Sequence, residues 1–182
     1  ISDIEKQKST LVKYDGQFYH VFFHSLIVYP ELAFDGDFMH EGYDMWMTTV
    51  SEFKNMLPQL YDRGFILYPL NEIEKDKEVL LPPGKKPLII SIDDVCYYEY
   101  MKNDGFADRL VINDEGEVAC EVRTPEGETI VTYDGDVMPI LDQFVKEHPD
   151  FSYRGAKGVV AVTGYEGALG YRITDLEGQE LT

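Results

Sequence analysis

Two adjacent carboxylates, Asp93 and Asp94, directly follow an apolar run in the stretch KPLIISIDDV. Consecutive side chains point in different directions from an extended backbone, so one carboxylate can hold a metal ion while the other accepts a proton. A metal-bound water is a strong nucleophile at neutral pH, and a neighbouring carboxylate can act as its base. The pair therefore indicates metal-assisted hydrolysis. The alternative, that both are solvated loop residues beyond a strand, stays open from the pair alone.

Histidine is the natural companion of such a metal, and the chain has four: His20, His24, His40 and His148. His20 and His24 form an HxxxH string, which on a helix brings both rings to one metal. The string lies in YHVFFHSLIV, however, which reads as a strand. At ~3.3 Å per residue the two positions are ~13 Å apart, too far to share one zinc ion. His24 alone remains a candidate pocket residue.

Polar residues lie in or just beyond the C-terminal parts of three predicted strands, at residues 18–29, 88–92 and 157–163. In α/β sheets and barrels, functional residues gather at the C-terminal ends of the strands. Besides His24 and the aspartate pair, this rule selects Thr163 and Glu166 as candidate pocket residues. Tyr98 joins them as an aromatic residue beside a predicted loop. Trp46 and Tyr43 are also aromatic residues in or beside predicted loops. Sugar-binding grooves use such rings, although packing in the core is the favoured interpretation for Trp46, Tyr43 and Tyr98 alike.

The elements that must position these groups follow in the order strand, helix, strand, insertion, helix, strand. Residues 30–47 read as a long loop. A helix follows, with Thr49 and Glu52 forming a capping box, Pro58 introducing a kink and Gly64 ending it. A short strand is expected at residues 65–70, and the run at 88–92 is continuously apolar, which is typical of a strand covered on both faces.

The second half of the chain changes character at residues 108–133. This stretch alternates polar and apolar residues and contains two turn signals, DEG and PEG, so we expect a two- or three-stranded antiparallel excursion. Residues 136–147 predict a short helix, and residues 157–163 predict a third buried strand. The fold class is therefore α/β with parallel strands.

Composition sets limits on partners. The chain has 182 residues, 44% of them hydrophobic, which is enough for one domain with a real core. The formal net charge of −18 argues against nucleic acid and anionic membranes, because phosphate binding needs clustered Lys and Arg. No run of 18 apolar residues is present, so no membrane-spanning segment is expected. Two cysteines, Cys96 and Cys120, are too few for a disulfide framework; their pairing is left open.

Several stretches together resemble one known family, the polysaccharide deacetylases (the NodB homology domain), and within it a subset from Gram-positive bacteria. The resemblance covers most of residues 18–172. It is carried by FFHSLIVYPELAFDGD, YDMWMTTVSEFKNML, LPPGKKPLIISIDDVCYYEYM and GDVMPILDQFVKEHPDFSYRGAKGVVAVTGYEG.

The resemblance implies an irregular (β/α) barrel of the glycoside hydrolase/deacetylase type, here partial, with an antiparallel hairpin insertion around residues 108–133. It implies that Asp93 is the catalytic base and that Asp94 ligates a divalent metal ion, for which zinc is the favoured identity. The reaction that the resemblance implies is hydrolysis of N- or O-acetyl groups of a cell-wall or extracellular polysaccharide. The family's downstream histidine motif, H(S/T)xxH, has no match after Asp94, so we expect the chain alone to be inactive and to hold no metal tightly.

By this interpretation residues 1–17 are a polar lead-in, residues 18–173 the N-terminal portion of the barrel, and residues 174–182 a polar tail. We expect the exposed strand edges to be covered by the remaining part of the barrel or by a second copy. Because the chain begins at Ile1 rather than Met, we expect an upstream signal or anchor and a secreted or cell-surface protein. The alternatives are a non-catalytic glycan-binding module, a degenerate deacetylase homologue, or an interaction domain that docks through the 108–133 hairpin.

Overall fold

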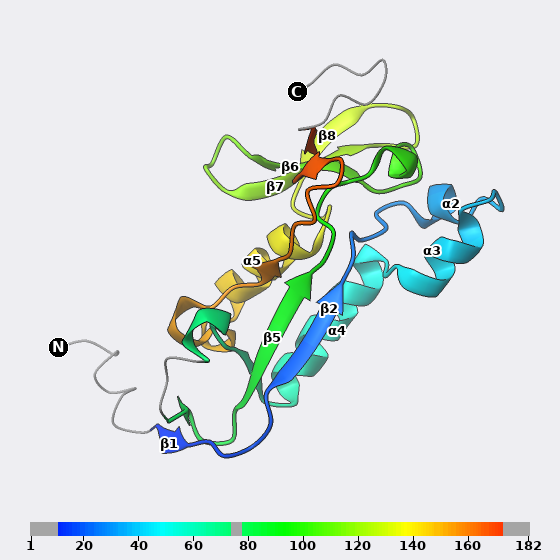
Figure 1. Ribbon diagram of the computed structural model, residues 1–182. Coiled ribbons are helices and arrows are strands. Elements are labelled where there is room, and N and C mark those ends of the chain that lie inside the picture. The colour runs from blue at the N-terminus through cyan, green and yellow to red at the C-terminus, as the bar shows by residue number, and fades with distance from the viewer. Residues whose placement is uncertain (1–10, 74–77, 173–182) are drawn as a thin grey trace.

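A parallel sheet built around one buried strand organises the molecule (Figure 1). The computed structural model describes residues 11–73 and 78–172. Strand β5 (Lys86–Ile92) pairs in parallel with β2 (Tyr19–Phe23) along one edge and with β3 (Phe65–Leu67) and β9 (Val159–Val160) along the other. Residues 87–92 are all buried, which confirms the strand predicted from their continuous apolar run.

Two helices cover one face of this sheet. Helix α4 (Val50–Asp62) begins at the predicted capping box, in which the Glu52 backbone N–H donates to Thr49 Oγ1 over 3.2 Å and the Thr49 N–H donates to Glu52 Oε2 over 2.9 Å. It continues through Pro58 to Asp62. Helix α5 (Val137–Glu147) follows the N-cap residue Asp136.

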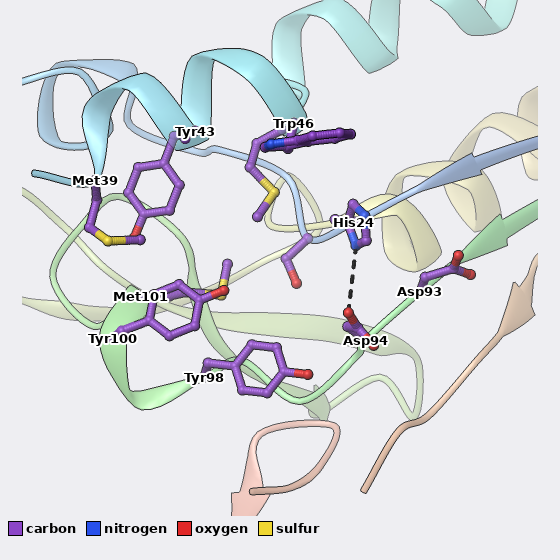
Figure 2. A pocket seen from close by; sticks show the side chains of 12 residues that line it. His24, Met39, Tyr43, Trp46, Asp93, Asp94, Tyr98, Tyr100 and Met101 are labelled. Carbon is purple, nitrogen blue, oxygen red and sulfur yellow. Dashed lines mark ion pairs between the residues drawn. The ribbon is translucent and has the colours of Figure 1, made fainter. Parts of the chain in front are cut away.

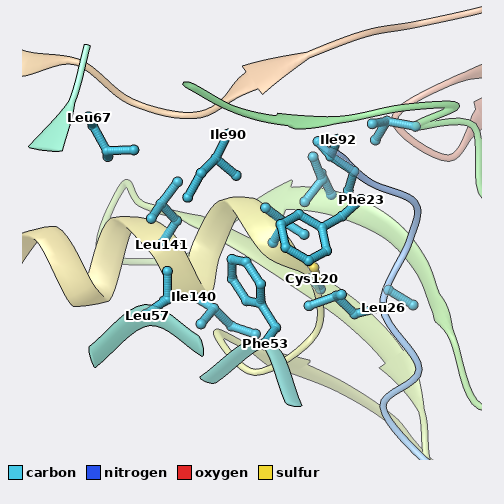
Figure 3. Close-up of a cluster of buried hydrophobic side chains, with 14 of the residues drawn as sticks. Phe23, Leu26, Phe53, Leu57, Leu67, Ile90, Ile92, Cys120, Ile140 and Leu141 are labelled. Atoms are coloured by element: carbon cyan, nitrogen blue, oxygen red, sulfur yellow. The ribbon is translucent and has the colours of Figure 1, made fainter. Parts of the chain in front are cut away.

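The main core lies between these helices and the sheet (Figure 3). Alternate residues of β5 point toward the helices, as the pleat of a strand requires. Aromatic and aliphatic side chains from α4 and α5 fill the space between them. The buried members labelled in the figure are Phe23, Leu26, Phe53, Leu57, Leu67, Ile90, Ile92, Cys120, Ile140 and Leu141.

The antiparallel excursion predicted for residues 108–133 is confirmed. Strands β6 (Ala107–Ile112), β7 (Val118–Arg123) and β8 (Thr129–Thr132) form a three-stranded meander. Gly116 and Gly127 stand in its two turns with φ of 78° and 87°, a backbone conformation that glycine adopts without strain. The meander packs against the end of α5 and continues the main core.

The segment at residues 30–47 is not the loop that the sequence predicts. It contains α2 (Pro30–Ala33) and α3 (His40–Trp46). Both helices are short, and each buries a single residue, so they carry too few apolar positions for a helical period to show. Tyr43 of α3 packs in a second core cluster with Ile27 and Phe106.

The prediction of a third buried strand at residues 157–163 is wrong in length and in burial. Only Val159–Val160 pair with β5, and Val160 and Val162 are 37% and 47% exposed. The lead-in expected to be loose also contains structure: β1 (Val12–Lys13) pairs antiparallel with β4 (Leu80–Leu81). The expected polar tail, residues 174–182, lies outside the described residues.

Short elements complete the described chain. They are η1 (Leu70–Glu72), η2 (Glu99–Met101), η3 (Pro149–Phe151), η4 (Tyr153–Gly155), β10 (Gly167–Ala168) and β11 (Tyr171–Arg172). The described residues thus form a mixed α/β structure with several small sheets. The partial (β/α) barrel stays a prediction. None of the described helices is long and apolar enough to cross a membrane.

Candidate functional site

A cavity of about 260 Å³ lies beyond the C-terminal ends of β2 and β5 (Figure 2). Helix α3 forms one side of it, and the segment that follows β5 forms the other. The lining combines two carboxylates, an imidazole, aromatic rings and methionines. Its members are His24, Ser25, Met39, Gly42, Tyr43, Trp46, Met47, Asp93, Asp94, Tyr98, Tyr100 and Met101.

The structure brings together both aspartates and His24, as the rule of strand ends predicts. Asp93 still belongs to the sheet, because its backbone N–H donates to the Phe23 carbonyl over 2.7 Å. The backbone then turns at Asp94, whose φ is 54°, in the left-handed region that a non-glycine residue seldom adopts. This turn separates the directions of the two carboxylates while keeping both in the cavity wall.

A chain of polar contacts supports Asp93 from the sheet. Ser91 precedes it by two positions and therefore lies on the same side of the strand. The Ser91 hydroxyl lies 3.4 Å from Asp93 Oδ1 and 2.9 Å from His20 Nε2. His20 is thus engaged with Ser91, and its ring is separate from that of His24.

His24 and Asp94 are two residues of metal-ligand type that lie near each other in the wall. Nδ1 of His24 lies 4.0 Å from Oδ2 of Asp94, and both side chains are partly exposed. Within residues 11–73 and 78–172, however, no three His, Cys, Asp or Glu side chains are grouped as metal ligands. Zinc takes three or four protein ligands, so the described residues do not by themselves fit a zinc site.

Aromatic rings form the two sides of the cavity. Trp46 of α3 is 69% exposed, and its ring lies opposite the segment that carries Tyr98 and Tyr100. The rings of Tyr98 and Tyr100 stack, with centroids 5.4 Å apart and planes at 11°. Burial raises the pKa of both tyrosines, so their hydroxyl groups stay protonated at neutral pH. Tyr98 lines the cavity and also packs against the second core cluster. Trp46 lines the cavity but is mostly exposed, so its interpretation as a core residue is wrong.

Thr163 and Glu166 are not among the residues that line the cavity. The Thr163 hydroxyl lies 3.3 Å from the Tyr98 hydroxyl. Glu166 accepts a 2.8 Å hydrogen bond from the backbone N–H of Glu99, and it lies 3.5 Å from a guanidinium nitrogen of Arg172. Both residues thus hold the segment that carries the aromatic rings.

A buried carboxylate, Asp136, anchors the site from the interior and was not identified as functional from the sequence. Its Oδ1 accepts from the backbone N–H groups of Leu26, at 3.2 Å, and Val137, at 2.7 Å. Its Oδ2 accepts from the hydroxyl of Tyr97. Burial raises the pKa of Asp136 to about 6, and these hydrogen bonds oppose that rise. The contacts join the segments after β2 and β5 to the start of α5.

The two cysteines are both free and buried. Cys96 Sγ lies 3.2 Å from Thr163 Oγ1 and 3.2 Å from the Gly167 carbonyl oxygen. Cys120 belongs to the main core. The two thiols therefore have separate surroundings and do not form a disulfide in this structure.

No protein-family model, curated protein or solved structure matches the chain. The chemistry of the site is therefore read from its own residues. Two carboxylates and an imidazole can accept protons or polar hydrogens, while exposed aromatic faces and thioethers offer apolar contact. Such a mixture suits a ligand that has both apolar faces and many hydroxyl or amide groups.

Proposed function

We propose that this chain is part of a metal-dependent carbohydrate deacetylase, which removes N- or O-acetyl groups from a secreted or cell-wall glycan. The observation that carries the proposal is the position of Asp93 and Asp94, which directly follow the central strand β5 and line an aromatic cavity. The resemblance of the sequence to polysaccharide deacetylases supports the same reaction and the same two residues.

The cavity has the chemistry that an acetylated sugar requires. A pyranose ring presents C–H groups on its faces, and these pack on aromatic rings such as Trp46 and Tyr98. The thioethers of Met39, Met47 and Met101 adapt their shape to a small apolar group such as an acetyl methyl. Polar groups at the β5 end are then left to bind hydroxyl and amide groups.

The proposal gives the two aspartates different roles. Asp93, held by Ser91 at 3.4 Å, is the proton acceptor. Asp94 would be one ligand of a divalent metal in the complete enzyme, and such a metal would supply Lewis-acid chemistry at this end of the cavity. The described residues do not group three ligands, so the remaining ligands of that metal would come from outside them.

The sheet face opposite the helices is relevant to the same proposal. Phe22 pairs with Ser91 on this face and is 59% exposed. An exposed apolar side chain on a parallel sheet is unusual, because such sheets are normally covered on both faces. We expect further barrel elements or a second copy of the chain to cover this face. Light scattering of the purified chain distinguishes the two, because a second copy doubles the measured mass.

A second candidate function is glycan binding without catalysis. It is favoured by one specific observation, that Asp94 and His24 lack a third metal-ligand side chain in the described part of the chain. In this case the aromatic cavity would still bind the sugar. The acidic groups would then serve as hydrogen-bond acceptors.

Calorimetric titration with a tetramer of N-acetylglucosamine, combined with an assay for released acetate, tests both candidates. We expect binding that Trp46→Ala weakens and that Phe38→Ala leaves unchanged, because Phe38 is 95% exposed and does not line the cavity. Acetate release by the complete gene product favours the deacetylase, and binding without release favours the second candidate. If acetylated glycans, including acetylated xylan, neither bind nor lose acetate, both candidates are wrong.

A further inference from the structure

We propose that Tyr98, Tyr100 and Tyr165 form an outer sugar-binding platform beside the cavity, so that the site takes an oligosaccharide of several units rather than a single sugar. The inference rests on the proposed function, since it extends the same site. It adds a specific prediction, which is that the affinity grows with the number of sugar units. It also assigns Tyr165, which does not line the cavity, to ligand binding.

The three rings form a continuous series. Tyr98 is its middle member, because its centroid lies 5.4 Å from that of Tyr100 and 6.4 Å from that of Tyr165. Tyr98 and Tyr100 line the cavity, whereas Tyr165 does not line it and lies next to Tyr98 with the two ring planes at 58°. A ligand that is bound in the cavity and extends past Tyr98 would meet the ring of Tyr165 next.

The outer rings are exposed far more than a packing role requires. Tyr100 is 50% exposed and Tyr165 is 76% exposed, and Trp46 across the cavity is 69% exposed. Single exposed aromatic residues are ordinary on protein surfaces, but a contiguous group beside a cavity marks a binding site. Aromatic side chains also give a large contact area at a low cost in conformational entropy.

A buried ionic network holds the platform from behind. Arg172 is 9% exposed, and its guanidinium donates to the backbone carbonyl oxygens of Cys96, at 3.3 Å, and Tyr97, at 2.8 Å. The same guanidinium lies 3.4 Å from a Glu99 carboxylate oxygen and 3.5 Å from one of Glu166. Tyr98 is thus flanked on both sides in the sequence by residues that Arg172 fixes.

The network joins the two segments that carry the rings. The Glu99 N–H donates to Glu166 over 2.8 Å, and the Tyr98 hydroxyl lies 3.3 Å from Thr163. Tyr165 lies between Thr163 and Glu166 in the sequence, so it is tied to the Tyr98 segment on both sides. A platform fixed in this way loses little conformational freedom on binding, which favours affinity.

Charge narrows the class of oligosaccharide. Asp93 and Asp94 lie in the cavity wall, and no Lys or Arg is among the described residues that line it. Glu99 and Glu166 near the platform are paired with Arg172, and the chain as a whole carries a formal charge of −18. Anionic glycans such as polyuronates are therefore disfavoured, and the platform fits a neutral acetylated glycan.

Calorimetric titration with oligomers of N-acetylglucosamine, from one to six units, tests this inference. The wild-type chain is expected to bind the tetramer at least about tenfold more tightly than the monomer, since each stacked ring contributes ~0.5–1.5 kcal/mol. Tyr165→Ala should weaken binding of the tetramer by about tenfold or less. The same variant should leave the affinity for the monomer unchanged. Tyr165→Phe should restore the loss, because stacking needs the ring and not the hydroxyl. Phe38→Ala is the matched control for removal of an exposed ring.

A second measurement avoids any dependence on variants. In the wild-type chain with labelled tyrosine rings, the tetramer should shift the NMR signals of Tyr98, Tyr100 and Tyr165, and the monomer should leave that of Tyr165 unchanged. Equal affinity for monomer and tetramer, with Tyr165 unperturbed by both, overturns the platform while leaving the proposed function intact. Absence of binding by every oligomer and by acetylated xylan overturns both. Tighter binding of oligogalacturonate than of the neutral tetramer contradicts the assigned glycan class.

Discussion

The hydroxyl of Tyr97 donates a hydrogen bond to the carboxylate of Asp136 in the interior of the molecule. Tyr97 follows the aspartate pair by three positions, and Asp136 caps helix α5. Their contact therefore links the segment that forms one side of the cavity to a helix of the main core. The geometry of the site depends on this link, and the link makes the stability of the protein sensitive to pH.

Replacement of Asp136 by Asn should flatten the dependence of stability on pH. Burial raises the pKa of Asp136 from 3.8 to about 6, so the folded protein binds this proton more tightly than the unfolded chain. The resulting stabilisation is fully present below pH 4 and is lost as the pH rises through about 6, and the difference amounts to roughly 3 kcal/mol. Urea denaturation of both proteins from pH 4 to 7 measures it. Parallel pH profiles for the two proteins would count against the raised pKa.

Replacement of Tyr97 by Phe should cost more stability at pH 7 than at pH 4.5. The change removes the hydroxyl that donates to Asp136 and leaves a buried carboxylate oxygen without that donor, at a cost of about 1–3 kcal/mol. The hydrogen bond lowers the pKa of Asp136, so its loss raises that pKa further and penalises the ionised form most. Denaturation at the two pH values measures the effect, and an equal cost at both would contradict it.

Phe53→Ala should strongly destabilise the protein, because Phe53 lies in the core between the sheet and the helices. Phe53 is fully buried, and its ring packs edge-on against Phe23 with centroids 4.9 Å apart. We expect a loss of about 3–5 kcal/mol in the free energy of unfolding. Phe38→Ala removes the same side chain from a position that is 95% exposed, so it should change stability by less than about 0.5 kcal/mol. Similar losses for the two variants would contradict the placement of the core.

Gly105 and Gly36 both have positive φ, so alanine variants at these two positions distinguish backbone strain from steric overlap. Gly105 and Gly36 have φ of 82° and 91°, but a Cβ at Gly105 would lie 2.3 Å from the Tyr29 carbonyl oxygen, whereas one at Gly36 meets nothing within 4 Å. Gly36→Ala should cost about 1 kcal/mol from strain alone. Gly105→Ala should cost about 3 kcal/mol, because the overpacking adds to the strain. Thermal or urea denaturation measures both; equal costs would mean that the loop at Gly105 is not packed against Tyr29.

Much of the fold follows from patterns that are strong and local. The unbroken apolar run of β5 indicates a central strand, and the capping box at Thr49 marks the start of α4, because each pattern has one dominant physical cause. The edge strand β9 shows the limit of this reasoning. The stretch that contains β9, KGVVAVT, is as apolar as a buried strand. Burial depends on what packs against a strand, however, and Val160 and Val162 stay partly exposed.

The site could be predicted only in part. Strand ends bring His24 and the aspartates together because parallel strands end at the same edge of a sheet. The opposite side of the cavity comes from the short helix α3, which carries Trp46, and its N-cap residue Met39, and this helix is too short to give a periodic signal. The same rule of strand ends selects Thr163, but its hydroxyl lies near Tyr98 and Cys96, and it does not line the cavity.

The most direct test of the deacetylase assignment is acetate release by the complete gene product, measured with acetylated oligosaccharides for the wild type, Asp94→Asn and Asp114→Asn. Asp114 is an exposed turn residue outside the cavity, so its variant controls for the loss of one carboxylate. The proposal predicts that Asp94→Asn lowers the rate of acetate release by at least about 100-fold, because the variant loses a metal ligand or a charged group of the catalytic centre. Asp114→Asn should retain the wild-type rate. Unchanged acetate release by Asp94→Asn, or no release by the wild type with added zinc, would contradict the assignment.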